Sequence, residues 1–578
     1  MAVLKGIPAA PGIAMGKVIT VDSEELLVPR RTIADDDVAR EIQRLDEALA
    51  HTRSQLQLIQ KRLEHDLGQE HAEIFNAHLL VLEDQSLREE ILQGLRRDKL
   101  NVEAVVNDVI RRHLKAFSRT NDEYLRERTA DIEDVRKRIL RNLLGKSSRM
   151  LQALTQPAVI VARDLSPSET AQMHRRHVLA FITEIGGRTS HTAIMAKSLE
   201  IPAVVGLTQA MEIIPRGKTV IVDGTRGEVI VDPDAETIER YKVEERRYQE
   251  LNRQLMQLKN LPAETLDHHH VHLWANIELP EEVKSVVAHG ASGIGLFRTE
   301  FLYLNRDGFP TEEEQYRAYR SVMEQMGQGP VVIRTMDLGG DKFLSPMQLP
   351  EMNPFMGWRG IRFSLTRPDI FRTQLRAALR ASIHGDLRIM YPLISGVEEI
   401  QRAKEILEEV RQELRQEGIP FKDVKVGAMI EVPSAALTCD ILAQEVDFFS
   451  IGTNDLIQYS LAVDRVNEKI AHLYEPTHPA VLRLVKNIVE CAHTAKIPVA
   501  MCGEMAGEPS MTLLLLGMGI DELSTSPVQL PLVKRVVRAV EYSFARQVAQ
   551  QAMKLRNSKE VETFLLASLR QVVPDLAE

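Results

Sequence analysis

The chain has 578 residues, of which 44% are hydrophobic and 27% are charged, and its formal net charge at pH 7 is −10. This length exceeds what one hydrophobic core usually supports, so we expect several domains, and the acidic balance argues against nonspecific binding of nucleic acid. The longest apolar run, residues 511–520, is about half a membrane span, so we expect no membrane helix. The three cysteines form no CxxC pair, so we expect neither a zinc site nor a disulfide framework, and a cytoplasmic protein.

The first part of the chain contains a long helical region. Residues 31–156 contain no proline, and mostly apolar side chains recur three or four positions apart over residues 42–63, which is the spacing of one helix face. Further helical patterns follow at residues 71–85, 90–100, 102–117 and 131–144. We therefore predict a small helical bundle over residues 31–145.

Short strand-like runs lie on both sides of this bundle. They cover residues 17–21 before it and residues 157–162, 177–183, 218–224 and 227–232 after it. The bundle is thus predicted to be inserted into an α/β domain made of residues 1–30 and 146–233. A charged helical stretch follows between Pro233 and Pro262, and we interpret residues 234–261 as a connecting helix.

Residues 262–578 show eight apolar runs that alternate with helical stretches. The runs cover residues 272–277, 293–297, 330–335, 387–392, 426–431, 447–452, 498–503 and 520–525. Eight such units in a segment of this length predict a TIM (β/α)₈ barrel. The predicted fold class is therefore multidomain α/β, with the barrel at the C-terminal side.

Polar side chains gather where the barrel strands are predicted to end. Active sites of such barrels lie at the carboxyl ends of the strands, so we expect these side chains to share one site. They are Arg298, Arg334, Glu431, Asn454, Asp455 and Cys502.

The arginines indicate the class of ligand. Arg298, Arg334 and Arg465 each carry a planar guanidinium that matches phosphate or carboxylate oxygens, so we predict a small phosphorylated anion. Each arginine taken alone could instead pair with an acid of a neighbouring loop. The long connection between residues 335 and 388 is interpreted as an active-site loop that carries Arg359.

Two acids and a cysteine complete the predicted site. Glu431 and Asp455 follow neighbouring strands, and two carboxylates together with water and substrate oxygens suit Mg²⁺. Taken singly, Glu431 could be a buried hydrogen-bonded acid and Asp455 a helix N-cap. Cys502 could be a small core residue, although its position at a strand end suits a general acid.

One histidine stands out in the stretch GGRTSHTAIMAKSLEIPAVVG, residues 186–206. A strand pattern leads into Gly186 and Gly187, which open a turn before a helix. His191 then lies in the first helical turn, where backbone N–H groups stabilise a phosphate and disfavour imidazolium, so it could carry a phosphoryl group. Alone, it could also be an ordinary structural histidine.

Together these segments resemble the phosphoenolpyruvate-utilising phosphotransferases, and within them the Enzyme I family of the sugar phosphotransferase system. The resemblance covers nearly the whole chain, and one small departure is Gly360, where many relatives carry alanine. Besides the stretch around His191, the matching motifs are GIPAAPGIAMGKV (6–18), DLSPSETAQM (164–173), GIGLFRTEFLY (293–303), RTMDLGGDK (334–342), NPFMGWRGIR (353–362), DFFSIGTNDLIQYSLAVDR (447–465) and MCGEMAG (501–507).

The resemblance implies a reaction. The chain is expected to transfer a phosphoryl group from phosphoenolpyruvate to His191, with release of pyruvate, and then to a histidine of the carrier protein HPr. Thr170, Gly186 and Gly187 are implied to support the phosphohistidine. The helical bundle is implied to dock HPr, and the domain with His191 to swing between the barrel and the carrier.

The resemblance also implies roles for the barrel. Glu431 and Asp455 are expected to bind Mg²⁺, and Cys502 to protonate the enolate of pyruvate. A homodimer formed through the barrel is expected. Phosphoenolpyruvate is expected to be held by Arg298, Arg334, Arg359, Asn454, Asp455 and Arg465.

Other functions remain open at this point. Pyruvate phosphate dikinases and phosphoenolpyruvate synthases share these motifs but carry a nucleotide-binding region, where residues 1–156 offer a helical bundle. A regulatory phosphotransferase of the nitrogen-related branch would use the same residues, but that branch usually has an extra N-terminal domain, whereas the match here begins at residue 6. A non-catalytic scaffold is disfavoured because no expected reactive residue is replaced.

Overall fold

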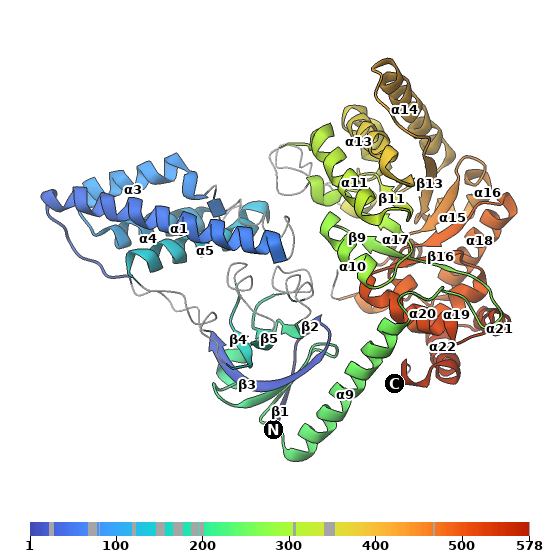
Figure 1. Ribbon diagram of the computed structural model, residues 1–578, viewed down its shortest axis with the longest axis horizontal. Coiled ribbons are helices and arrows are strands. Elements are labelled where there is room, and N and C mark those ends of the chain that lie inside the picture. Colours follow the sequence, from blue (N-terminus) through green and yellow to red (C-terminus); the bar gives the residue numbers. More distant parts are fainter. Residues whose placement is uncertain are drawn as a thin grey trace. The chain divides into compact units, whose positions relative to one another are not determined.

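The computed structural model describes residues 1–21, 28–66, 78–79, 81–117, 123–145, 156–165, 177–186, 196, 201–303, 308–339, 353–465, 467 and 469–576. The chain forms two compact units, Met1–Asn252 and Arg253–Glu578. The division falls inside one long helix, α9 (Ala235–Gln257), which is drawn in green in Figure 1. This helix coincides with the charged stretch that the sequence predicts as helical.

The helical part of the first unit is a bundle with its own apolar core. The helices whose bounds are described are α1 (Val38–Asp66), α3 (Gln85–Asp98), α4 (Val102–Phe117) and α5 (Glu123–Leu143). Leu45, Leu95 and Ile110 are buried between them, as the helical spacing predicts. The helix expected over residues 71–85 lies largely outside the described residues.

The first unit also contains an eight-stranded sheet. Its order is β1-β8-β7-β3-β4-β5-β6-β2, and apolar residues cover both of its faces. The sequence predicts five of these strands and misses β1, β2 and β6 together with the short helix α8 (Ala210–Ile213). The strands are β1 (Ala2–Lys5), β2 (Ile7–Ala10), β3 (Ile13–Val21), β4 (Ala158–Ala162), β5 (Val178–Thr183), β6 (Ala203–Val205), β7 (Thr219–Asp223) and β8 (Glu228–Val231).

The second unit is a closed barrel of eight parallel strands, which confirms the predicted TIM-type fold. Each strand lies within two residues of the run that predicts it, because strands covered on both sides keep continuous apolar runs. The strands are β9 (His272–Ile277), β10 (Ile294–Phe297), β11 (Val331–Arg334), β12 (Leu387–Tyr391), β13 (Lys425–Ile430), β14 (Phe448–Ile451), β15 (Val499–Met501) and β16 (Glu522–Thr525).

Helices alternate with the barrel strands and pack their apolar faces on them. One of them begins with a capping box, in which Thr311 accepts from the N–H of Glu314 while the Glu314 carboxylate accepts from the N–H of Thr311. The helices are α10 (Val283–Ala288), α11 (Glu312–Met326), α12 (Ile361–Thr366), α13 (Pro368–Ala381), α14 (Val397–Gln416), α15 (Pro433–Leu437), α16 (Cys439–Leu442), α17 (Thr453–Leu461), α18 (Pro479–Ala495), α19 (Pro509–Met518), α20 (Leu530–Arg538), α21 (Tyr542–Ala552) and α22 (Ser558–Val572).

The strand register brings distant segments to one end of the barrel. Ile430 pairs with Ile451, and Ile451 with Met501, so the residues that follow β13, β14 and β15 emerge side by side. Among the described residues, no helix is both long enough and apolar enough to cross a membrane.

Candidate active site at the carboxyl end of the barrel

A cavity of about 400 Å³ lies at the carboxyl ends of the barrel strands. It is walled by side chains from strand ends and from the loops that follow them, which is where barrels of this type place reactive groups. All of the barrel residues expected from the sequence line it: Arg298, Arg334, Arg359, Glu431, Asn454, Asp455, Arg465 and Cys502.

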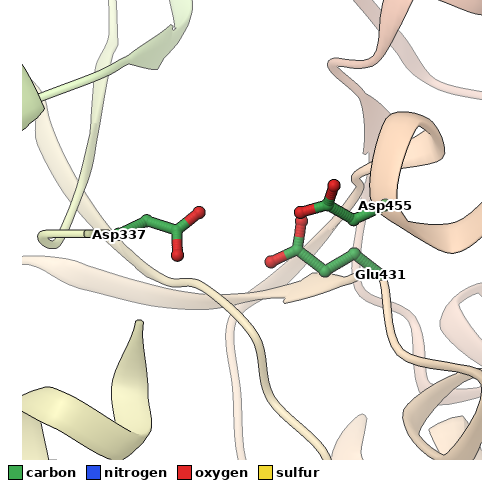
Figure 2. A group of neighbouring side chains, drawn as sticks. All are labelled: Asp337, Glu431 and Asp455. Carbon is green, nitrogen blue, oxygen red and sulfur yellow. The ribbon is translucent and has the colours of Figure 1, made fainter. Parts of the chain in front are cut away.

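Three carboxylates meet in this cavity. Asp337, Glu431 and Asp455 offer oxygens that all lie within 4.8 Å of one another, and their exposed fractions are 7%, 2% and 8%. Figure 2 shows the carboxylates of Glu431 and Asp455 together, with Asp337 pointing toward them from a different part of the chain. Buried, mutually repelling carboxylates are the donor set that a divalent cation stabilises, so this group can hold a metal ion.

Each acid is placed by the end of a strand. Glu431 directly follows β13, and its Oε1 accepts a hydrogen bond of 2.6 Å from the backbone N–H of Leu393. Asp455 lies in the first turn of α17, which follows β14. Burial, followed by repulsion from Asp455 and Asp337, raises the pKa of Glu431 to about 8.

Arg359 bridges the two sides of this cluster. Its Nε and Nη2 donate to Oδ1 and Oδ2 of Asp337 at 3.1 and 2.7 Å, and Nη2 also donates to Oδ2 of Asp455 at 3.0 Å. Burial opposes the charge of Arg359, but Asp337 and Asp455 outweigh it and raise the pKa of the guanidinium. The fork-shaped contact fixes the plane of the guanidinium at the cavity wall.

Arg334, the last residue of β11, is held in a similar way. Its Nη2 donates to Glu300 at 3.0 Å, and its Nη1 lies 3.2 Å from Oδ2 of Asp337. Although burial disfavours its charge, Glu300 and Asp337 raise the pKa of Arg334. Both arginines therefore stay charged in a largely buried position.

The remaining arginines sit nearer the solvent. Arg298 donates to Glu278, and Arg465 lies 3.6 Å from Oε1 of Glu504. Asn454 donates to the same Oε1 at 3.2 Å and accepts from the N–H of Glu504 at 3.0 Å. Each of the four arginines thus has an acidic partner and also lines the cavity, so pairing with loop acids and lining the site are compatible.

The acids that hold the arginines are not predicted from the sequence. Asp337 stands three residues after its partner Arg334 in RTMDLGGDK, and this short spacing on one loop could have indicated the pair. Glu300 pairs with the same Arg334 from 34 positions earlier, and Glu504 pairs with Arg465 from 39 positions later, so no short spacing indicates either contact.

Cys502 lies at the end of β15 and is 3% exposed. Its N–H donates to the carbonyl of Ile451 at 3.1 Å, and its side chain packs with apolar neighbours that include Met429 and Phe448. Burial raises the pKa of the thiol, so Cys502 is protonated at neutral pH. A protonated thiol at the cavity wall can act as an acid.

The expected phosphohistidine region belongs to the first unit. His191, Thr170 and Gly187 lie outside the described residues. Gly186 follows β5 with a φ of 127°, a backbone conformation that favours glycine, as expected for a residue that opens a turn.

Comparison with known proteins identifies the family. The chain matches the PEP-utilising enzymes in three segments: the N-terminal domain at residues 5–128, the mobile domain at residues 154–227 and the PEP-binding domain at residues 252–542. Over 97% of its length it is 46% identical to the phosphoenolpyruvate-protein phosphotransferase of Priestia megaterium, covering 98% of that protein. The chain belongs to the phosphoenolpyruvate-protein phosphotransferase family.

Two further family members are similar over the same extent. The phosphoenolpyruvate-protein phosphotransferase of Haemophilus influenzae is 45% identical over 97% of this chain and 98% of its own length. The protein of the same name from Bacillus subtilis is 45% identical over 97% of this chain and 99% of its own length. The family resemblance drawn from the sequence motifs is therefore confirmed.

Proposed function

We propose that the chain takes the phosphoryl group of phosphoenolpyruvate onto His191, releases pyruvate, and passes the group to a histidine of HPr as the first step of the sugar phosphotransferase system. The observation that carries this proposal is the cavity at the barrel mouth, where Arg334, Arg359 and three buried carboxylates converge in a member of this family. Such a site suits a small, highly charged phosphate ester.

The arginines bind and orient the substrate. Arg298, Arg334 and Arg359 offer guanidinium donors to the phosphoryl oxygens, and Arg465 with Asn454 offers donors at the more exposed wall. In this proposal the substrate replaces part of the acidic pairing seen around these side chains. Their positive charge stabilises the transferring phosphoryl group, whose transition state spreads negative charge over three oxygens.

Glu431 and Asp455 are the residues that would hold Mg²⁺. Both carboxylates are buried, and Mg²⁺ is usually bound by one or two protein carboxylates together with water and substrate oxygens. When bound, the ion would supply positive charge that neutralises the substrate and lowers the barrier for phosphoryl transfer.

Transfer breaks the bond between phosphorus and the enol oxygen and forms a bond between phosphorus and a ring nitrogen of His191. The enolate that leaves needs a proton on its methylene carbon to become pyruvate. Cys502 lines the cavity with a protonated thiol, and we assign this proton to it. Thr170, Gly186 and Gly187 are assigned to the support of the phosphohistidine.

The proposed division of labour follows the sequence. Residues 31–145 dock HPr, and residues 1–30 with 146–233 carry His191. Residues 234–261 connect this domain, which moves between barrel and carrier, to residues 262–578, which bind phosphoenolpyruvate and form a homodimer. The chain works in the cytoplasm.

Intact mass spectrometry tests the proposal. After incubation with phosphoenolpyruvate and Mg²⁺, the chain should gain one acid-labile phosphoryl group with release of an equal amount of pyruvate, and a chelator should prevent both. Added HPr should then remove the group. Phosphorylation that requires ATP, or no adduct at all, would contradict the proposal.

A further inference from the structure

Asp337 has a place in the cavity that none of the proposed roles uses. It follows β11 and is 7% exposed. Its two carboxylate oxygens accept hydrogen bonds of 3.1 and 2.7 Å from Nε and Nη2 of Arg359. Its Oδ2 also lies 3.2 Å from Nη1 of Arg334. One carboxylate thus contacts both of the buried arginines of the site.

The backbone of Asp337 is fixed as well. Its N–H donates to Oε1 of Glu300 at 2.9 Å, and the same oxygen accepts from Nη2 of Arg334 at 3.0 Å. Arg334, Asp337 and Glu300 therefore form a closed network on one wall of the cavity. Because each of these three residues contacts the other two, the network restrains the orientation of the Arg334 guanidinium.

Gly360 lies beside this carboxylate. It has a φ of 57°, and a Cβ added there would lie 2.9 Å from Cβ of Leu393 and 3.1 Å from Oδ1 of Asp337. The absence of a side chain at this position leaves room for the carboxylate beside Arg359. The same Leu393 donates its N–H to Glu431, so the space at Gly360 adjoins both the arginines and the acidic cluster.

Two roles for Asp337 are chemically possible. Its oxygens lie within 4.8 Å of those of Glu431 and Asp455, which would suit a third metal ligand. Against this, its two oxygens already take three contacts from two guanidinium groups, and a carboxylate offers about four lone-pair sites. A cation held by Asp337 would have to share these oxygens with the guanidinium groups of Arg334 and Arg359, whose positive charges repel it.

We propose that Asp337 is a positioning residue that orients Arg334 and Arg359 toward the phosphoryl group, and that it is not a ligand of the metal. This inference rests on the proposed function of the same cavity.

The variant Asp337→Asn of the full chain separates positioning from metal binding, because it removes the charge and one acceptor. Asp369→Asn is the matched control, since Asp369 pairs with Arg367 at the surface and its side chain is 62% exposed. Fluorescence of Trp274 and Trp358 reports whether the barrel of each variant is folded.

Binding of Mn²⁺ alone, followed by electron paramagnetic resonance, is measured beside single-turnover phosphorylation by phosphoenolpyruvate. Asp337→Asn is expected to slow phosphorylation at saturating substrate on the order of a hundredfold, because the orientation of two buried arginines is lost. Its dissociation constant for Mn²⁺ is expected to stay within about threefold of that of the parent chain.

Two outcomes would overturn the inference, and a third would contradict the proposed function. A loss of Mn²⁺ affinity of tenfold or more in Asp337→Asn would make Asp337 a metal ligand and overturn the inference. Phosphorylation as fast as in the Asp369→Asn control would also overturn it. A parent chain that binds Mn²⁺ but takes up no phosphoryl group would contradict the proposed function itself.

Discussion

Replacing Glu522 by glutamine should stabilise the barrel in alkaline solution. Glu522 is the first residue of β16, and it is 6% exposed. Burial is the main cause that raises its pKa to about 7, and repulsion from Asp521 and Asp386 adds to this, whereas Arg388 and Lys425 act in the opposite direction. The folded chain therefore favours the neutral carboxyl group.

The size and sign of the effect follow from this shift. The folded-state pKa of about 7 lies above the ordinary value of 4.5, so the stabilising contribution of the protonated group is complete below 4.5 and is lost as the pH rises through about 7. This difference corresponds to about 3 kcal/mol once the group is ionised. Glu522→Gln is expected to be more stable than the parent by about 3 kcal/mol near pH 8, and by little near pH 4.5.

Denaturant unfolding followed by tryptophan fluorescence is the assay. Both tryptophans, Trp274 and Trp358, belong to the unit Arg253–Glu578, so the signal reports on the barrel. Glu490→Gln is the control, since the Glu490 side chain is 64% exposed and pairs with Lys486 at the surface of α18, so its effect is expected to stay within about 0.5 kcal/mol at either pH. A stability difference that is the same at both pH values, or a variant of Glu522 that is less stable near pH 8, would show that folding does not raise the pKa of Glu522.

Three further substitutions test the cavity. Arg334→Ala is expected to slow phosphorylation by phosphoenolpyruvate at least about a thousandfold, because charge opposite the phosphoryl group is lost; rapid quenching measures this, and a loss below about tenfold would remove Arg334 from the transfer step. Asp455→Asn is expected to weaken Mn²⁺ binding at least about tenfold in paramagnetic resonance titrations, and equal affinity would place the metal elsewhere. Cys502→Ala is expected to slow the exchange of pyruvate methyl hydrogens with deuterated solvent at least about a hundredfold, as followed by proton magnetic resonance; unchanged exchange would assign the proton to another group.

The strands of the fold differ in how well the sequence predicts them. The barrel strands are predicted because each is covered on both faces and therefore keeps an unbroken apolar run. β1 and β2 form the two edges of the eight-stranded sheet, where a strand has one neighbour and its residues are more exposed. β2 also contains Pro8, which an edge strand tolerates and which hides the strand from a sequence pattern.

The sequence likewise predicts only part of the site. Strand ends place Glu431, Asp455 and Cys502 correctly at one cavity, because the geometry of a barrel converts positions after strands into neighbours. The alternative that Asp455 caps α17 does not hold, since the N-cap is Gly452 and Asp455 accepts from Arg359 instead. The contact of Asp337 with Arg359 joins residues 22 positions apart, which no local pattern contains, whereas its contact with Arg334 lies within three residues.

The residue that carries the phosphoryl group can be mapped by peptide mass spectrometry. The chain and its His191→Ala variant would be incubated with phosphoenolpyruvate and Mg²⁺ and digested under alkaline conditions, with His177→Ala as the control in the same domain. We expect one acid-labile phosphoryl group on the peptide that contains His191, present in the control and absent from His191→Ala. A phosphoryl group on another residue, or one that persists in His191→Ala, would show that His191 is not the acceptor.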